Sequence, residues 1–136
     1  MDFSCVGTDP KGQYYMKYNK PFSFAERIQL LERSILVNSF AYYILDDNIL
    51  NDFQYDDNAK ELAELKKEHP EDFKRSRYYE YFKDYCNDED MVYTSGFDLL
   101  ERVRKADYDL YSRLHEDASM ALRLKYNMKE RRDVHV

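Results

Sequence analysis

The sequence predicts an all-α fold: a single small bundle of four or five helices behind an extended N-terminal arm. The 136-residue chain contains only 3 Gly and 3 Pro, a composition that argues against a turn-rich β-sandwich and is typical of long helices. Apolar residues recur at three- and four-residue spacing along several stretches. The length is that of one domain with a real core. We therefore expect an arm at residues 1–22 and one helical domain at 23–136.

The first helix is expected over residues 23–45. Ser23 and Glu26 have the spacing of a capping box. The apolar stripe that follows consists of Phe24, Ile28, Leu31, Ile35 and Tyr42, widened by Leu30, Leu36, Phe40 and Tyr43. The helix is expected to stop at Asp46-Asp47-Asn48, because these side chains favour turns by bonding to their own backbone.

Further helices are expected over residues 52–68, 70–86 and 97–130. Asp52 can cap the first of these, and His69-Pro70 ends it because the residue before proline avoids the α region. In the last helix the expected inner stripe includes Ala121 and Leu124, and a break can occur near Asp107–Asp109. We expect short extended stretches at 13–18 and 91–93. Gly96 can allow close approach of backbone or a ligand, or form part of a turn, and we prefer the turn.

Charge and composition exclude several classes of partner. The net charge of −6 argues against a nucleic-acid backbone, which requires a basic face. Four cations near the C-terminus are expected to complement a helix dipole; they are Lys125, Lys129, Arg131 and Arg132. Two cysteines are too few for a disulfide framework, and no apolar run approaches the ~20 residues that span a bilayer. No secretory signal is recognisable. We expect a cytoplasmic protein without a membrane partner.

A candidate binding slot lies at the junction of the first two helices. Tyr42 ends one helix and Tyr55 lies in the first turn of the next, so the two rings can face each other and stack on a flat heteroaromatic ring, which is worth roughly 1–3 kcal/mol per base. A cationic ring such as nicotinamide adds cation–π attraction. Asp52 and Asp56 share a helical face with Tyr55 and can bond an amide or ribose hydroxyls. Alternatively, Asp52 is only an N-cap and Asp56 only a first-turn acid.

These residues form a recognisable pattern. Tyr42, Asp46, Asp52, Tyr55 and Asp56 precede a helix that closes on His69-Pro70-Glu71. The pattern resembles the N-terminal lid (Ia) domain of NAD⁺-dependent bacterial DNA ligases, which grips the nicotinamide mononucleotide half of NAD⁺, and the likeness covers roughly residues 24–71.

The resemblance implies a role for each matching position. Tyr42 and Tyr55 would stack on the nicotinamide, and Asp52 and Asp56 would make the polar contacts. Tyr43 stands where the family has a histidine; it keeps one hydrogen bond but cannot carry positive charge. A smaller departure is Asn48, which replaces a family proline.

Catalysis is not expected, because none of the 3 glycines follows the lysine of a K-x-D-G adenylation motif. No cofactor is required; the candidate ligands are NAD, NMN or an ADP-ribose-type nucleotide. From the resemblance we expect a phage-type protein that acts as a sponge or modulator of NAD-linked host defence. The alternatives are a module that binds and inhibits a host protein, with its first candidate surface at Tyr78–Tyr85, and an NAD-consuming enzyme.

No metal site is expected. The acidic stretch around Asn87 lacks the alternating ligands and central glycine of an EF-hand. His69, His115 and His135 have no partner at zinc spacing, so we interpret them as helix-end, surface and tail residues.

Overall fold

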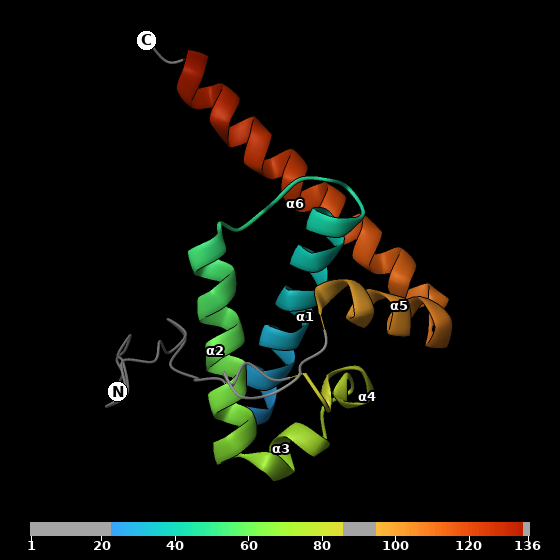
Figure 1. The fold of residues 1–136 in the computed structure, drawn as a ribbon. Helices are drawn as coiled ribbons and strands as arrows, with labels where there is room; N and C mark the ends of the chain where they lie inside the picture. Colours follow the sequence, from blue (N-terminus) through green and yellow to red (C-terminus); the bar gives the residue numbers. More distant parts are fainter. Residues whose placement is uncertain (1–22, 86–94, 135–136) are drawn as a thin grey trace, which may run out of the picture.

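The computed structural model describes residues 23–85 and 95–134, and these ranges contain six helices and no strand (Figure 1). The helices are α1 (Phe24–Tyr43), α2 (Asp52–Glu68), α3 (Pro70–Lys74), α4 (Tyr79–Phe82), α5 (Gly96–Ala106) and α6 (Tyr108–Val134). The all-α prediction is therefore confirmed. The expected arm at 1–22 and the extended stretches at 13–18 and 91–93 lie outside the described residues.

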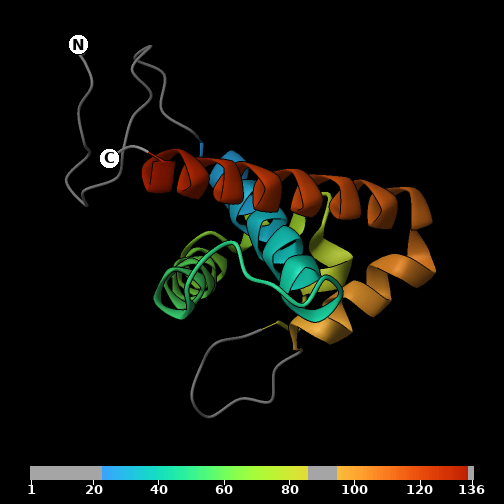
Figure 2. The ribbon, with the colours of Figure 1, turned by 90° about the horizontal axis from the view of Figure 1, so that it is seen from above.

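α1 is the central helix of the bundle. It contacts α2, α3, α5 and α6, and in the view from above it lies between α2 and α6 (Figure 2). Its fully buried side chains include Ile28, Ile35, Leu36 and Phe40. Burial of each such side chain contributes roughly 1.5–3 kcal/mol, so this one helix organises the core. No helix in the described ranges is long and apolar enough to cross a membrane.

Two ion pairs, one bidentate and one with a single short contact, connect the central helix to its neighbours. The Arg27 guanidinium donates to both carboxylate oxygens of Glu61 on α2 at 2.7 Å. Arg33 donates to Asp117 on α6 at 2.6 Å. These pairs link α2 and α6 to α1.

Local sequence signals set most helix ends. Ser23 accepts the backbone N–H of Glu26 at 3.1 Å and Glu26 accepts that of Ser23 at 2.9 Å, which confirms the capping box. α1 ends at Tyr43, and Asp46 then takes a positive φ of 57°, a conformation that Asp tolerates better than most residues. The predicted cap of α2 was wrong. Asn51 is the N-cap, paired with Gln54, and Asp52 is the first helical residue.

The predicted helix 70–86 is two short helices. Between them Ser76 is buried, donates from its hydroxyl to Glu32 and accepts the N–H of Tyr78 at 3.1 Å. This side-chain bonding competes with helix continuation. Tyr78 and Tyr85 are buried, at 5% and 6% exposure, so these two rings are not part of the surface predicted there for a partner protein, whereas Tyr79 and Tyr81 are partly exposed.

The predicted helix 97–130 is divided at Asp107, near the expected break. Asp107 has φ −152° and ψ 85°, outside the α region, and its carboxylate accepts the N–H of Leu110 at 3.1 Å. α6 extends past the rest of the bundle (Figure 1), which leaves Leu124 at 55% exposure. Its assignment to the inner stripe was therefore wrong.

The assignment of both ends of the α1 stripe was also wrong. Phe24, Leu30, Tyr42 and Tyr43 are between 44% and 57% exposed. Phe24, Tyr42 and Tyr43 lie at the two ends of the helix and Leu30 lies in its middle, and none of the four is fully covered by its neighbours.

One buried acid stands out in this core. Glu32 of α1 is fully buried; one carboxylate oxygen accepts from Ser76, and the other has no hydrogen-bond partner among the described residues. Burial raises the pKa of Glu32 from its ordinary 4.5 to about 7, although the Ser76 bond and the Lys66 charge act in the opposite direction. The folded chain thus favours the neutral acid.

We predict that Glu32→Gln stabilises the protein more at pH 8.5 than at pH 4.5. A raised carboxyl pKa contributes stability that is complete below about pH 4.5 and is lost as the pH rises through about 7. The gain over the unmodified chain should grow between the two pH values by on the order of 2 kcal/mol. Urea unfolding at both pH values measures it, with the exposed Glu116→Gln as control. An equal effect of Glu32→Gln at both would contradict the prediction.

Candidate functional site

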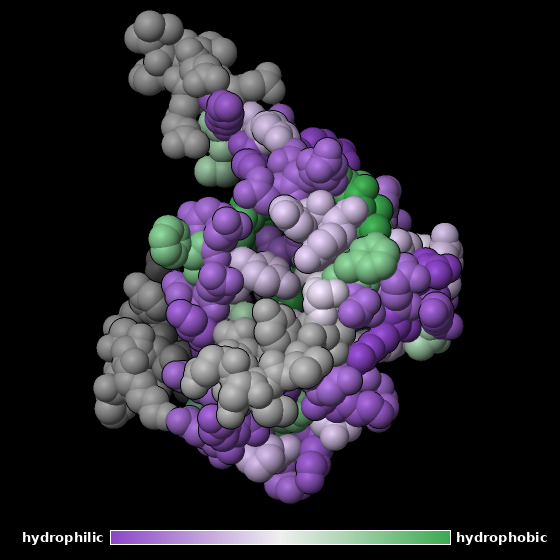
Figure 3. Space-filling view, in the orientation of Figure 1, coloured by the Kyte–Doolittle hydropathy of each residue, from purple (hydrophilic) through white to green (hydrophobic). Residues whose placement is uncertain are grey.

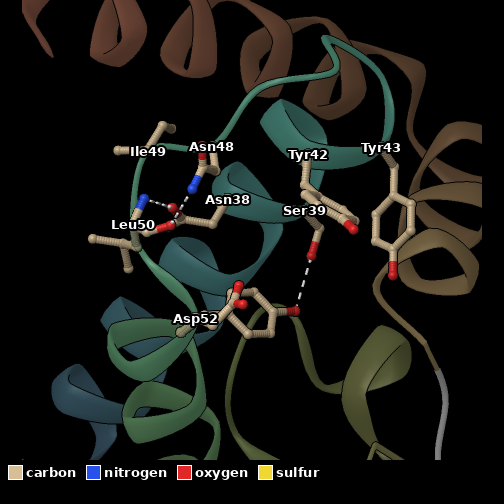
Figure 4. A pocket seen from close by; sticks show the side chains of 9 residues that line it. Asn38, Ser39, Tyr42, Tyr43, Asn48, Ile49, Leu50 and Asp52 are labelled. Atoms are coloured by element: carbon tan, nitrogen blue, oxygen red, sulfur yellow. Dashed lines mark hydrogen bonds between the residues drawn. The ribbon is translucent and has the colours of Figure 1, made fainter.

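A cavity lies at the junction between the end of α1, the 44–51 loop and the start of α2 (Figure 4). Its volume is about 130 Å³. It is lined by Asn38, Ser39, Tyr42, Tyr43, Asn48, Ile49, Leu50, Asp52 and Tyr55. The space-filling view shows the surface hollowed between the upper parts of α1 and α2, on a face that is otherwise mostly hydrophilic (Figure 3). The hairpin junction predicted as the site therefore forms a real depression.

Two polar side chains of α1 hold the cavity walls in place. The Ser39 and Tyr55 hydroxyls are hydrogen-bonded at 3.1 Å, and Asn38 accepts the N–H of Leu50 at 3.2 Å (Figure 4). The Asn48 amide also donates to the Leu50 carbonyl at 3.2 Å. Asn38 and Ser39 were missed in the sequence, although a polar pair inside an apolar helical stripe is a signal that could have revealed them.

The tyrosines form an aromatic wall. The rings of Tyr42 and Tyr43 meet edge to face, with centroids 4.8 Å apart and planes at 89°. Tyr43 in turn meets the edge of Phe97 from α5 at 6.0 Å. Burial raises the pKa of Tyr43, and Tyr55, Tyr42 and Asp98 raise it further through their charges. Tyr43 is therefore a neutral phenol that can donate one hydrogen bond.

Four of the five predicted site residues meet at this cavity. Tyr42, Tyr43, Asp52 and Tyr55 line it. Asp56 is exposed on α2, one turn beyond Asp52, and is not part of the lining. The structure thus brings four of the predicted residues to one cavity and leaves Asp56 outside its lining.

Gly96 lets α5 approach the cavity wall closely. A Cβ at this position would lie 2.6 Å from the Ser39 Oγ and 3.0 Å from the Tyr43 ring. Gly96 is the first residue of α5, after the N-cap Ser95, so its predicted role as part of a turn was wrong. The missing side chain instead permits contact between α5 and α1.

Two side chains of α6 donate hydrogen bonds to the loop that forms one side of the cavity. The Tyr126 hydroxyl donates to the Asp47 carboxylate, and the Lys125 ammonium donates to the Asn48 carbonyl at 2.5 Å. The Tyr126 bond lowers the pKa of Asp47, with help from the Asn48 N–H and Lys125. Lys125, which was expected to complement the helix dipole, thus also donates a hydrogen bond to the loop. These contacts join residues 77 and 79 positions apart, so no local pattern announces them.

The remaining candidates have structural roles. The His69 ring stacks on Phe24 with centroids 3.7 Å apart at the end of α2, and His115 is exposed beside the edge of Phe40. Among the residues that the structure describes, no three His, Cys, Asp or Glu side chains could together hold a metal ion.

Comparison with known proteins identifies the hairpin. Residues 21–77 match the model of the family described as the DNA ligase-like, N-terminal NAD⁺-binding domain. The resemblance predicted from the sequence is thus confirmed over this segment, which contains every lining residue of the cavity. This homology supports a binding function related to NAD for the hairpin.

The individual relatives are DNA ligases. The chain is 41% identical to the DNA ligase of Petrotoga mobilis over 51 residues, which are 38% of this chain and 8% of the ligase. It is 40% identical to those of Thermosipho africanus over 48 residues and Porphyromonas gingivalis over 47, each 35% of this chain and 7% of the ligase. The chain therefore matches less than a tenth of their length. No solved structure matches it significantly.

We predict that Gly96→Ala destabilises the protein by about 1–2 kcal/mol, because the added methyl displaces the Ser39 hydroxyl from Tyr55. Urea unfolding measures the loss. In a Ser39→Ala background the same change should cost less, since the Oγ contact is gone. Equal costs in both backgrounds would show that the close approach is not at Ser39.

We predict that Tyr126→Phe loosens the 44–51 loop without unfolding the bundle. The variant keeps the ring but loses the bond to Asp47, so the Leu50 amide should exchange with solvent several-fold faster. Hydrogen exchange followed by NMR measures this rate. The matched control is Tyr108→Phe, an exposed tyrosine at the other end of α6; an equal rate change in both variants would exclude a specific role for Tyr126.

Proposed function

We propose that the cavity binds the nicotinamide ring of NAD or of an NAD-derived nucleotide, without catalysing a reaction on it. The observation that carries the proposal is the meeting of three tyrosines and the Asp52 carboxylate at one cavity. That cavity lies within the segment that matches the NAD⁺-binding domain of ligases. Aromatic faces and a carboxylate are what a flat, positively charged ring requires.

The size of the cavity supports a single ring. An apolar cavity of roughly 150 Å³ holds one benzene molecule, and this cavity measures about 130 Å³. An open depression of this size can take most of one aromatic ring, while the ribose and anything attached to it remain outside. Asp56 is exposed one turn beyond Asp52 on α2 and is placed to contact a ribose hydroxyl there.

The sequence supports binding without adenylation of a lysine. A ligase adenylates a lysine in a K-x-D-G motif, and this chain has no such motif. We therefore propose a role of capture, in the cytoplasm of a bacterial host: a phage protein that sequesters an NAD-derived signal or modulates NAD-linked defence. The ligand is then NAD, NMN or an ADP-ribose-type nucleotide. What supports this role is the resemblance of the hairpin to a ligase lid.

A second candidate function is binding and inhibition of a host protein. The surface that favours it is the projecting half of α6, where Met120, Leu124 and Met128 are 50–60% exposed at a spacing of four residues. Side chains at this spacing share a helical face, and exposed methionines suit adaptable contacts.

We predict that Tyr42→Ala and Tyr55→Ala each weaken binding of nicotinamide mononucleotide by about 1–3 kcal/mol, the contribution of one stacking face. Calorimetry measures the affinity. Tyr42 is 57% exposed, so its removal should leave the unfolding midpoint almost unchanged, whereas Tyr55 contacts the core and its variant must be checked for folding. Tyr108→Ala, distant on α6, is the control. If the folded protein binds neither NAD nor the mononucleotide nor an ADP-ribose-type nucleotide below millimolar, the proposal fails.

A further inference from the structure

We propose that the cavity selects a cationic nicotinamide nucleoside over the same compound carrying a 5′-phosphate. This inference rests on the proposed function and specifies the ligand class for that site. It follows from the charges that the structure places on and around the cavity walls.

The lining itself carries one ionisable group that is charged at neutral pH. Asp52 contributes a carboxylate, and the other eight lining residues are neutral: three tyrosines, two asparagines, one serine, one isoleucine and one leucine. A pyridinium ring in the cavity gains attraction from Asp52 and from the aromatic faces. A phosphate held a few ångströms away on the ribose meets the same carboxylate as a like charge.

Further acidic side chains near the lining residues add to the negative charge of Asp52. Asp98 on α5 lies close enough to Tyr43 to raise its pKa through its charge. Asp47 lies in the loop beside the lining residue Asn48 and accepts the backbone N–H of that residue at 2.8 Å. Asp56 follows Asp52 by one helical turn. These carboxylates belong to α2, the loop and α5, each of which has residues at or beside the cavity, and the charge of Asp47 is partly offset by Lys125, 3.9 Å away.

The cation nearest to the loop is engaged with other groups. Lys125 donates to the Asn48 carbonyl at 2.5 Å and lies 3.9 Å from an Asp47 oxygen. A phosphate could recruit it only at the cost of these contacts with the loop. Tyr43 offers a neutral hydroxyl, which can donate one hydrogen bond but cannot neutralise a phosphate.

The expected difference in affinity between the riboside and the mononucleotide is large enough to measure. A phosphate monoester carries about −1.5 to −2 charges at pH 7, and near a protein surface one like charge at several ångströms costs enough to reduce affinity roughly tenfold. We therefore expect nicotinamide riboside to bind about tenfold more tightly than nicotinamide mononucleotide at low salt. Because salt screens exposed charges, the ratio should shrink at high ionic strength.

The experiment compares nicotinamide riboside with its mononucleotide by calorimetry on the full chain, at low and high salt. Asp52→Asn removes the attraction to the pyridinium ring from both compounds but removes the repulsion of the phosphate from the mononucleotide alone, so the ratio of their affinities should fall several-fold toward one. The control is Asp109→Asn, an exposed acid in the first turn of α6, which should leave the ratio unchanged. Circular dichroism verifies that each variant is folded.

The possible outcomes distinguish failure of the selection from failure of nicotinamide binding itself. A mononucleotide that binds as tightly as the riboside, or an affinity ratio that Asp52→Asn leaves intact, overturns the selection while ring binding stands. If neither compound binds the folded protein, the cavity is not a nicotinamide site and both proposals fail. A tenfold preference that fades with salt and with Asp52→Asn establishes the selection.

Discussion

The cavity depends on two polar side chains at the buried end of α1. Ser39 and Asn38 are 1% and 9% exposed, and buried polar groups are costly unless they are hydrogen-bonded. Ser39 meets this requirement through Tyr55 of α2, and Asn38 through Leu50 of the loop. The two hydrogen bonds that satisfy these buried groups therefore also hold the Tyr55 side chain and the loop backbone at Leu50. The stability of the hairpin and the shape of its cavity thus have one cause.

The segments beyond the ligase-like match also shape this site. Residues 21–77 supply every lining residue, but α5 and α6 support them from outside. Gly96 of α5 lies against Ser39 and Tyr43, and Tyr126 of α6 bonds Asp47 in the loop. The α5–α6 part of this chain thus acts as a brace for the hairpin junction. Changes in α6 can alter the loop without touching a lining residue.

The sequence predicted what is local and missed what is distant. Apolar periodicity and the Ser23–Glu26 box placed α1 well, and the tyrosine and aspartate spacing located the junction, because these signals lie within a few residues of one another. Sequence spacing could not show that Ser76 would interrupt the third helix by bonding to Glu32, 44 positions away. For the same reason it could not show the bonds from α6 to the loop. Exposure of Tyr42 and burial of Tyr78 likewise depend on which helices pack where.

A cavity for one ring limits what this protein can do by affinity alone. Stacking contributes roughly 1–3 kcal/mol per face, while association costs several kcal/mol in lost freedom. Stacking on one ring therefore offsets only part of the cost of association, so the proposed ring contact by itself gives weak binding. Tighter capture requires contacts from the part of the ligand outside the cavity, where Asp56 and the loop lie. A capture function built on this cavity would then depend on protein abundance and on the charge of those outer contacts.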